Sequence, residues 1–149
     1  MIGIDICNIS RFSSMKNLDK FLDRYFTHDE NNYILNTGNR GETIAGIFSL
    51  KEAFVKAIGT GFGSVRPIDV EITHNFSGKP DLIIHNDIVK KIEDISCSVS
   101  HDGDYAIAVV EVKLLNIKYE NIDICEIKKL MPSRKKDGHK GAFVKVGIV

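Results

Sequence analysis

A helical pattern over Glu42–Ile58 that runs directly into a glycine-rich loop constrains the fold of this chain more than any other feature. Apolar residues recur at helical spacing, at positions 44, 47, 48, 54, 55 and 58. We therefore predict one long helix with an apolar face. Gly59, Gly61 and Gly63 would end this helix and provide a backbone that a ligand can approach closely.

Two charged residues of the predicted helix, Glu52 and Lys56, are four positions apart, so their side chains lie one turn apart on one face. The small residues Ala45 and Ser49 lie beside them and would leave room for another group. A pair of this kind is most often a surface salt bridge worth about 0.3–0.5 kcal/mol. Ser49 and Glu52 also match a capping box, which would apply if the helix began at Ser49. The helix alone therefore leaves a surface role and an active-site role open.

The length and charge of the chain limit its organisation and its partners. With 149 residues, it suits one domain with a short appendage. Its net charge of zero gives no reason to expect nucleic acid or an anionic membrane as a partner, and its apolar runs are far shorter than a membrane span. Residues 1–115 carry 12 Lys+Arg and 16 Asp+Glu, whereas residues 116–149 carry 8 and 4. We therefore predict a domain over residues 1–115 and a basic tail over 116–149.

The cysteines are odd in number, far apart and without a CxxC pair: Cys7, Cys97 and Cys125. This pattern predicts neither a disulfide framework nor a zinc site. The N-terminus lacks the basic and apolar regions of a secretory signal, because polar residues interrupt it. The reducing cytoplasm is therefore the expected location.

The first residues alternate as in a β-strand, over Met1–Ile6, with Ile2, Ile4 and Ile6 on one face. Asp5 then points away from this apolar face. An acidic residue inside a short β pattern is unfavourable by propensity and suggests a functional purpose. An edge strand with Asp5 in water is the equally open alternative.

A basic stripe accompanies the next predicted helix, over residues 14–26. Lys16, Lys20 and Arg24 step along one face of it, and Arg11 precedes them. Such a stripe is commonly a solvated face. A docking surface for an acidic partner is the sharper hypothesis.

Further helix and strand signals follow along the chain. Thr27 and Glu30 have the spacing of a capping box, which predicts a helix that ends near residue 38. Alternating patterns predict two hairpins and one short helix: strands 69–73 with 81–85, strands 95–100 with 105–113, and a helix over 87–92. His101 would stand at the mouth of a tight turn, where a turn residue is commoner than a catalyst.

Asp5, Glu52, Lys56, His101 and the glycine-rich loop are the residues with chemical potential. Two converging carboxylates would bind a hard cation such as Mg²⁺, with waters and phosphate oxygens completing its coordination. A lysine beside them would neutralise phosphate charge. The combination indicates phosphoryl-group chemistry, although spacing alone does not show that Asp5 and Glu52 meet.

Four motifs occur in order along the chain. They are Gly3-Ile4-Asp5-Ile6 with Ile9 and Arg11-Phe12; Phe48–Ala57 with Gly59-Thr60-Gly61; Asp69–Ile72 with Gly78-Lys79-Pro80; and Ser98–His101 with Tyr105-Ala106 and Ala108. Together they resemble the holo-[acyl-carrier-protein] synthases, the small phosphopantetheinyl transferases, over about residues 1–115. The resemblance implies an α+β fold, in which an antiparallel sheet packs against a long central helix and shorter helices.

The resemblance also implies a reaction. A serine hydroxyl of an apo acyl carrier protein would attack the β-phosphate of coenzyme A, take the 4′-phosphopantetheine group and release adenosine 3′,5′-bisphosphate. Asp5 and Glu52 would ligate Mg²⁺, Glu52 would act as the base, and Lys56 would stabilise charge or relay the proton. A non-catalytic module for coenzyme A or the carrier protein is the alternative, as is another phosphoryl transferase.

Binding roles are implied for further residues. The residues implied to bind coenzyme A are Gly61, Gly63, Ser100 and His101. Many family members have a basic residue where this chain has Ile47, and Arg40 is the expected substitute. The residues implied to bind the carrier protein are Arg11, Lys16, Lys20 and Arg24, because carrier proteins are acidic. The resemblance further implies a homotrimer with sites at the subunit interfaces.

The tail beyond residue 115 has two parts. Residues 130–141 read as a basic, turn-rich linker, and residues 142–149 are apolar and β-prone. His139–Phe143 and Lys145–Val149 are similar to the start of an NAD(P)H-hydrate dehydratase domain. We expect a linker and the truncated start of a second domain, without a second activity. A terminal extension that pairs with the sheet or stays disordered is the alternative.

Overall fold

The computed structural model describes residues 1–115, which form an α+β fold as predicted. The elements in chain order are β1 (Ile2–Asn8), α1 (Ser10–Ser13), α2 (Leu18–Tyr25), α3 (His28–Asn36), α4 (Arg40–Ala57), the 3₁₀ helix η1 (Pro67–Asp69), β2 (Val70–His74), β3 (Pro80–Ile84), the 3₁₀ helix η2 (Asp87–Lys91), β4 (Ile92–Asp102) and β5 (Tyr105–Leu114). No helix in this part of the chain is long and apolar enough to cross a membrane.

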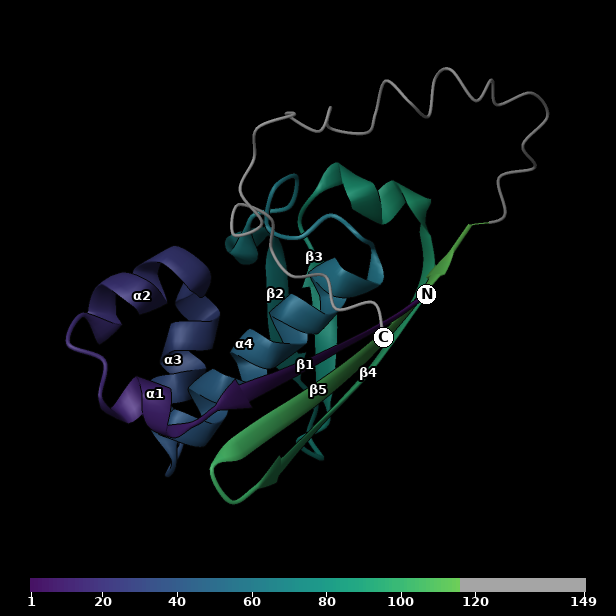
Figure 1. Ribbon diagram of the computed structural model, residues 1–149. Coiled ribbons are helices and arrows are strands. Elements are labelled where there is room, and N and C mark those ends of the chain that lie inside the picture. Colours follow the sequence, from purple (N-terminus) through teal and green to yellow (C-terminus); the bar gives the residue numbers. More distant parts are fainter. Residues whose placement is uncertain (116–149) are drawn as a thin grey trace, which may run out of the picture. The chain divides into compact units, whose positions relative to one another are not determined.

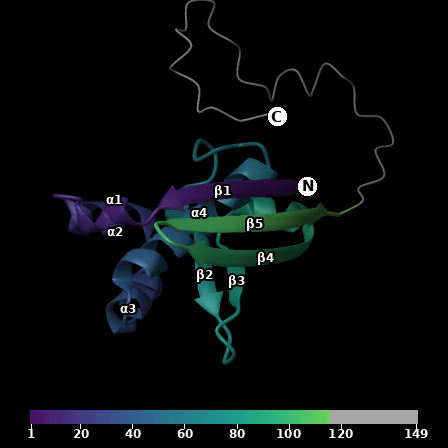
Figure 2. The same ribbon diagram turned by 60° about the horizontal axis from the view of Figure 1, so that its bottom comes forward.

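A three-stranded antiparallel sheet in the order β1-β5-β4 forms one layer, and α4 lies against one of its faces (Figure 2). The register aligns Asp5 of β1 with Ala108 of β5, and Ala108 with Val99 of β4. Strands β2 and β3 form a separate hairpin. Both predicted hairpins are confirmed, because alternating patterns joined by turn residues specify antiparallel pairing locally.

Helix α4 confirms the predicted central helix and is the centre of the core (Figure 1). The side chain of Asn39 caps it, accepting a hydrogen bond from the Glu42 N–H at 3.4 Å. Twelve of its 18 residues are buried, so the helix is buried on more than the one apolar face that the sequence predicted. The reason is that the sheet covers one side, while α1, α3 and β2 pack on others.

Strand β1 alternates as predicted, and it turns its isoleucines away from α4. The exposed fractions are 65%, 57% and 60% for Ile2, Ile4 and Ile6. Gly3 and Cys7 instead face α4 and are buried. A Cβ at Gly3 would collide with the Ala53 carbonyl oxygen, so the strand and the helix approach at backbone distance. Asp5 shares the side of Gly3 and is directed toward α4, which makes the alternative of Asp5 in open water wrong.

The predicted helix over residues 14–26 is shorter than expected, because α2 spans only Leu18–Tyr25; a separate short helix, α1, precedes the predicted range over Ser10–Ser13. The Asn8 carboxamide oxygen accepts from the Arg11 N–H at 3.2 Å and starts the chain turning early. Phe12 of α1 is buried against Phe21 of α2 and Phe48 of α4. Docking Phe12 in the core requires a break before α2 begins.

Helix α3 starts with the predicted capping box. The Thr27 hydroxyl accepts from the Glu30 N–H at 3.2 Å, and the Glu30 carboxylate accepts from the Thr27 N–H at 2.7 Å. Its other oxygen accepts from the Ile72 N–H of β2 at 2.7 Å. Glu30 therefore joins α3 to β2 as well as capping it.

The ammonium group of Lys51, on α4, completes this buried network. It donates to the Glu30 carboxylate at 2.7 Å, the Tyr25 carbonyl at 2.8 Å and the Pro67 carbonyl at 2.9 Å. Both side chains of the Lys51–Glu30 pair are 0% exposed. Burial lowers the pKa of Lys51, and the Glu30 carboxylate opposes this shift. All three donors of the ammonium are satisfied, as a buried charge requires.

We predict that removing one partner of this pair destabilises the protein strongly. Lys51→Met and Glu30→Gln should each lower the free energy of unfolding by about 3–5 kcal/mol, because a buried charge loses its partner. Urea unfolding followed by circular dichroism measures this. Lys113→Met is the control, since its pair with Glu93 is exposed and worth about 0–1 kcal/mol. Equal, small losses for all three variants would contradict the assigned role.

Candidate active site

Asp5 and Lys56 meet at the centre of the candidate site. The Lys56 ammonium donates to the Asp5 carboxylate at 2.7 Å, and the two side chains are 33% and 13% exposed. Strand β1 and the last turn of α4 supply the two groups. Among the ion pairs of residues 1–115, Lys56 pairs with Asp5 and not with Glu52. The surface bridge between Glu52 and Lys56, one of the two roles that the sequence left open, therefore does not form in this part of the chain.

Glu52 lies close enough to this pair for their charges to act on it. Burial raises the pKa of the Glu52 carboxyl most, and the negative charge of Asp5 raises it further. Lys56 and Arg11 act in the opposite direction. The fold therefore places the charges of Asp5, Glu52 and Lys56 close enough to interact, although up to 51 residues separate them in the sequence.

Arg11 connects the site to an aromatic cluster. Its guanidinium carbon lies 5.6 Å from the ring centre of Phe12, 5.8 Å from that of Phe21 and 5.5 Å from that of Phe48. Cation–π contacts of this kind hold the guanidinium in place while leaving its donors available. Arg11 is exposed, so it can reach a partner from beside the site.

The glycine-rich loop begins at Gly59, three residues after Lys56. Gly59 and Gly61 have φ angles of 73° and 57°, which lie in the left-handed region that favours glycine. The N–H groups of Thr60 and Gly61 both donate to the Val55 carbonyl, at 3.2 and 3.3 Å. The loop thus ends α4 as predicted, and it follows Lys56 closely in the sequence.

Two minor predictions about α4 were wrong. Ala45 and Ser49 are 0% exposed, and the Ser49 hydroxyl donates to the Ala45 carbonyl at 2.5 Å, so they leave no room for an approaching group. The capping box at Ser49 and Glu52 does not form, because the helix already begins at Arg40.

The donor set at Asp5 and Glu52 fits a hard divalent cation. Within residues 1–115, no group of three or more His, Cys, Asp or Glu side chains is arranged to hold a metal. Two carboxylates suit Mg²⁺, which keeps several waters and binds through one or two protein carboxylates together with substrate phosphates. The protein would thus supply only part of the coordination, and a phosphorylated ligand and water would supply the rest.

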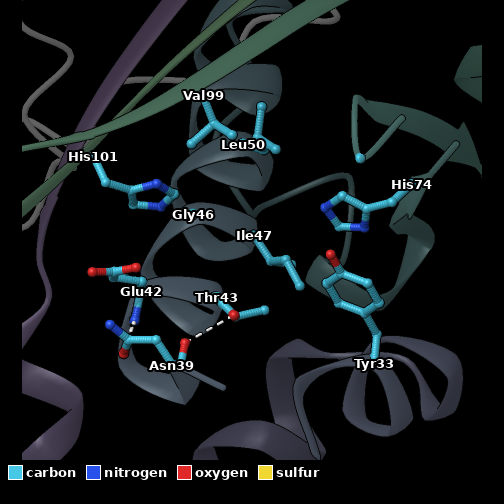
Figure 3. Close-up of a pocket in the computed structure, with 11 residues that line it drawn as sticks. Tyr33, Asn39, Glu42, Thr43, Gly46, Ile47, Leu50, His74, Val99 and His101 are labelled. Atoms are coloured by element: carbon cyan, nitrogen blue, oxygen red, sulfur yellow. Dashed lines mark hydrogen bonds between the residues drawn. The ribbon is translucent and has the colours of Figure 1, made fainter. Parts of the chain in front are cut away.

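A second candidate region is a cavity of about 330 Å³ beside the N-terminal half of α4 (Figure 3). His101 of β4 lines it, and a Cβ at Gly46 would come within 3.0 Å of the His101 Nε2 atom. Gly46 therefore makes space for the imidazole. Opposite, Tyr33 and His74 stack with ring centres 4.1 Å apart and planes inclined by 9°.

The structure does not bring all predicted site residues together. The lining of the cavity contains His101 but none of Asp5, Glu52 and Lys56. Other predicted coenzyme A contacts are also absent from its lining: Arg40, Gly61, Gly63 and Ser100. Ser100 is on the opposite face of β4 from His101, because side chains alternate along a strand. His101 itself belongs to β4 and pairs with Ala106, just before the turn.

Tyr33 and His74 are residues of the cavity that the sequence did not reveal. They come from α3 and β2, 41 positions apart, and neither stands in a motif. Only the packing of these two elements brings the rings together.

The predicted carrier-binding residues are all exposed: Arg11, Lys16, Lys20 and Arg24. Lys16 lies between α1 and α2, so the predicted stripe does not run along one helix. Asp19 and Asp23 of α2 are also exposed, so the basic groups of α2 stand beside acidic ones.

Comparisons with known proteins agree on one family. A family profile described as the 4′-phosphopantetheinyl transferase superfamily matches residues 1–110. The holo-[acyl-carrier-protein] synthase of Finegoldia magna is 41% identical over 114 residues, which cover 75% of this chain and 94% of the relative.

Two solved structures extend this similarity to the fold. The Helicobacter pylori holo-[acyl-carrier-protein] synthase in complex with coenzyme A is 34% identical with a TM-score of 0.70, covering 76% of this chain and 100% of that one. The Bacillus anthracis holo-(acyl-carrier-protein) synthase in complex with CoA (3′,5′-ADP) is 37% identical with a TM-score of 0.65, covering 74% and 93%. This chain therefore belongs to the 4′-phosphopantetheinyl transferase superfamily, and its fold is that of the holo-[acyl-carrier-protein] synthases.

Proposed function

We propose that this chain transfers the 4′-phosphopantetheine group of coenzyme A to a serine of an apo acyl carrier protein and releases adenosine 3′,5′-bisphosphate. The observation that carries the proposal is the grouping of Asp5, Glu52 and Lys56 in a member of this family. The solved relatives that contain coenzyme A support it as the donor.

The roles of the chain's own residues follow from their surroundings. Glu52 is the base that takes the proton of the serine hydroxyl, and its raised pKa suits a group that must hold a proton during turnover. Lys56 leaves Asp5 and donates to the phosphate oxygens on which negative charge develops. The glycine loop after Lys56, which lacks side chains at Gly59 and Gly61, gives the pyrophosphate room beside these residues.

Asp5 and Glu52 are the residues that would hold Mg²⁺. When bound, this ion neutralises charge on the pyrophosphate and fixes its orientation for in-line displacement. In its absence the Lys56 ammonium is the cation beside Asp5. Metal binding and the release of Lys56 toward the donor are therefore coupled.

The carrier protein docks beside α1 and α2. Arg11, Lys16, Lys20 and Arg24 supply exposed positive charge there, and Arg11 is also part of the electrostatic environment of Glu52. An acidic carrier bound on this side could place its serine hydroxyl next to Glu52. Asp19 and Asp23 limit the attraction, so docking depends mostly on Arg11, which the aromatic cluster holds in place.

The protein assembles as a homotrimer through the outer face of the sheet. Six apolar side chains, each between 38% and 65% exposed, lie together on β1 and β5: Ile2, Ile4, Ile6, Tyr105, Ile107 and Val109. A contiguous apolar patch of this kind marks an interaction surface. Association of copies would also bring the His101 cavity of one copy near the Glu52 site of the next, because each chain alone keeps them apart.

The remaining proposals concern the whole chain. We place its reaction in the cytoplasm, where thiols such as Cys7 and Cys97 stay reduced; both are free. The division at residue 115 and the similarity of the tail to a dehydratase domain stay predictions, since residues 116–149 lie outside the described part and beyond the family match.

We predict that incubation with apo acyl carrier protein, coenzyme A and Mg²⁺ raises the carrier's mass by one phosphopantetheine group in mass spectrometry. Glu52→Gln should lower the rate by about 10²–10⁴-fold, the range that a general base contributes. Binding of coenzyme A without any mass change would support a binding module instead. A near-normal rate for the variant would remove Glu52 from the mechanism.

The thermal stability of Glu52→Gln distinguishes a loss of catalysis from misfolding. Because the folded state raises the pKa of Glu52, ionised Glu52 disfavours folding at neutral pH. Metal-free Glu52→Gln should therefore melt above the wild type at pH 7.5. The difference should shrink as the pH falls toward about 4, where the unfolded carboxyl also takes up its proton.

We predict that Lys56→Gln binds Mn²⁺, used as a probe for Mg²⁺, more tightly than the wild type. The gain should be about two- to fivefold, which corresponds to an ion pair worth about 0.5–1 kcal/mol that no longer competes for Asp5. Electron paramagnetic resonance of free Mn²⁺ measures it. Lys90→Gln, which breaks an exposed pair with Asp87, should change nothing. Weaker Mn²⁺ binding by Lys56→Gln would contradict the competition.

We predict that Ile4→Glu converts the trimer to a monomer in sedimentation equilibrium and reduces transfer. A charge at the centre of the apolar face cannot be buried between copies. Val89→Glu is the matched control, because Val89 is 43% exposed on η2, outside this face. A monomeric wild type would exclude the trimer, and full activity of a monomeric variant would exclude a site shared between copies.

A further inference from the structure

Helix α2 presents charges of both signs on its exposed side. Its apolar residues pack toward the core, and every exposed residue of the helix is charged. These exposed residues are Asp19, Lys20, Asp23 and Arg24. The helix lies next to α1 and away from β4 (Figures 1 and 2). A partner that contacts this side of α2 therefore meets two carboxylates together with two cationic groups.

These charges form two rows along α2. Asp19 and Asp23 are four positions apart, so they lie one turn apart on one side, and we call them the acidic row. Lys20 and Arg24 have the same spacing and form the basic row. With 3.6 residues per turn, the two rows are about 100° apart around the helix axis. The exposed side of the helix is thus divided lengthwise by charge.

The stability of α2 does not explain this pattern. Like charges four positions apart destabilise a helix, and α2 contains no pair of opposite charges at that spacing. Lys20 in the first turn and Asp23 in the last turn also oppose the helix dipole, so only the outer charge of each row suits it. None of the four side chains forms an ion pair with a residue in the described part of the chain. All four charges are therefore available to a partner.

The two rows nearly cancel each other at a distance. Neighbouring residues have Cα atoms about 3.8 Å apart, whereas charges are screened over about 8 Å at physiological ionic strength. A distant carrier protein therefore experiences little net attraction from α2. A carrier in contact with the helix experiences each row separately, so the pattern acts on how the carrier docks and less on how fast it approaches.

The carrier of the proposed reaction has to match both rows. Its acidic side chains would pair with Lys20 and Arg24. A further acidic side chain placed against Asp19 or Asp23 would bring like charges together, which lowers the affinity. A basic side chain at the same place would instead pair with the carboxylate. Interfaces distinguish between related partners by repulsive contacts of this kind as well as by attractive ones.

We propose that Asp19 and Asp23 determine which carrier proteins this chain modifies. They favour an acidic carrier that has a basic side chain opposite the acidic row, and they disfavour a carrier that is acidic throughout its docking surface. This inference rests on the proposed function, because it assumes transfer to an acyl carrier protein docked on α2. The two aspartates act on the docking of the carrier and not on the chemical step.

Transfer to a panel of carriers tests the inference. The panel consists of an apo acyl carrier protein with a wholly acidic surface around its modified serine and of its variants, each with one of these acids replaced by lysine. Mass spectrometry gives kcat/KM at saturating coenzyme A and low salt. With the wild-type protein, at least one lysine carrier should exceed the parent about two- to threefold, the size expected for one exposed ion pair. Lysine carriers whose substituted acid faces the basic row should be poorer substrates than the parent.

Variants of α2 assign the selection to its residues. Asp19→Asn combined with Asp23→Asn should raise kcat/KM for the parent carrier about four- to ninefold, through KM and with kcat unchanged, and should abolish the advantage of the lysine carrier. At about 0.5 M salt this gain should fall below about 1.5-fold. Lys20→Gln is the matched comparison, because it also removes one like-charge pair from the helix, yet it should lower kcat/KM for the parent. Asp87→Asn, on η2, is the control and should change nothing.

Two results would overturn the inference. One is an equal gain for every carrier of the panel in the double variant, which would show an effect of net charge without selection. The other is a loss of kcat/KM for every lysine carrier with the wild-type protein, which is decisive even if a variant fails to fold. Either result would leave the proposed function intact, because the wild type still modifies the parent carrier. Transfer by the folded protein to no carrier of the panel would contradict the proposed function, and the inference with it.

Discussion

The burial of one ammonium group, that of Lys51, sets the arrangement of elements around α4. Each N–H group of a buried ammonium needs a hydrogen-bond acceptor, so the fold must place three oxygen atoms around the Lys51 Nζ atom. These come from α2, α3 and η1, and the same carboxylate extends to β2. The next residue, Glu52, faces the site on a different side of the helix. The interior network and the chemical site are therefore held by consecutive residues of one rigid element.

Local patterns predicted the elements well because each depends on nearby residues. The long helix, both hairpins and the Thr27 capping box follow from spacing and turn residues alone. The orientation of β1 could not be obtained in this way. Alternation shows two faces, but only the backbone contact at Gly3 determines which one meets the helix.

The site was predictable to the same limited degree. Asp5, Glu52 and Lys56 were identified from residue type and resemblance, whereas the Asp5–Lys56 bond depends on how β1 crosses α4. The stacking of His74 on Tyr33 joins two elements that share no motif, so no sequence pattern contains it. The missing information in both cases is tertiary: which elements touch and at what distance.

The contact of Gly3 with α4 has a consequence for the site. At this point the separation between strand and helix is set by main-chain atoms, with no side chain to adjust it. Any larger residue would push β1 outward and carry Asp5, two positions later on the same side, away from Glu52. A substitution at Gly3 would therefore disturb the packing of the core and the position of Asp5 at the same time, so this glycine links the stability of the fold to the geometry of the site.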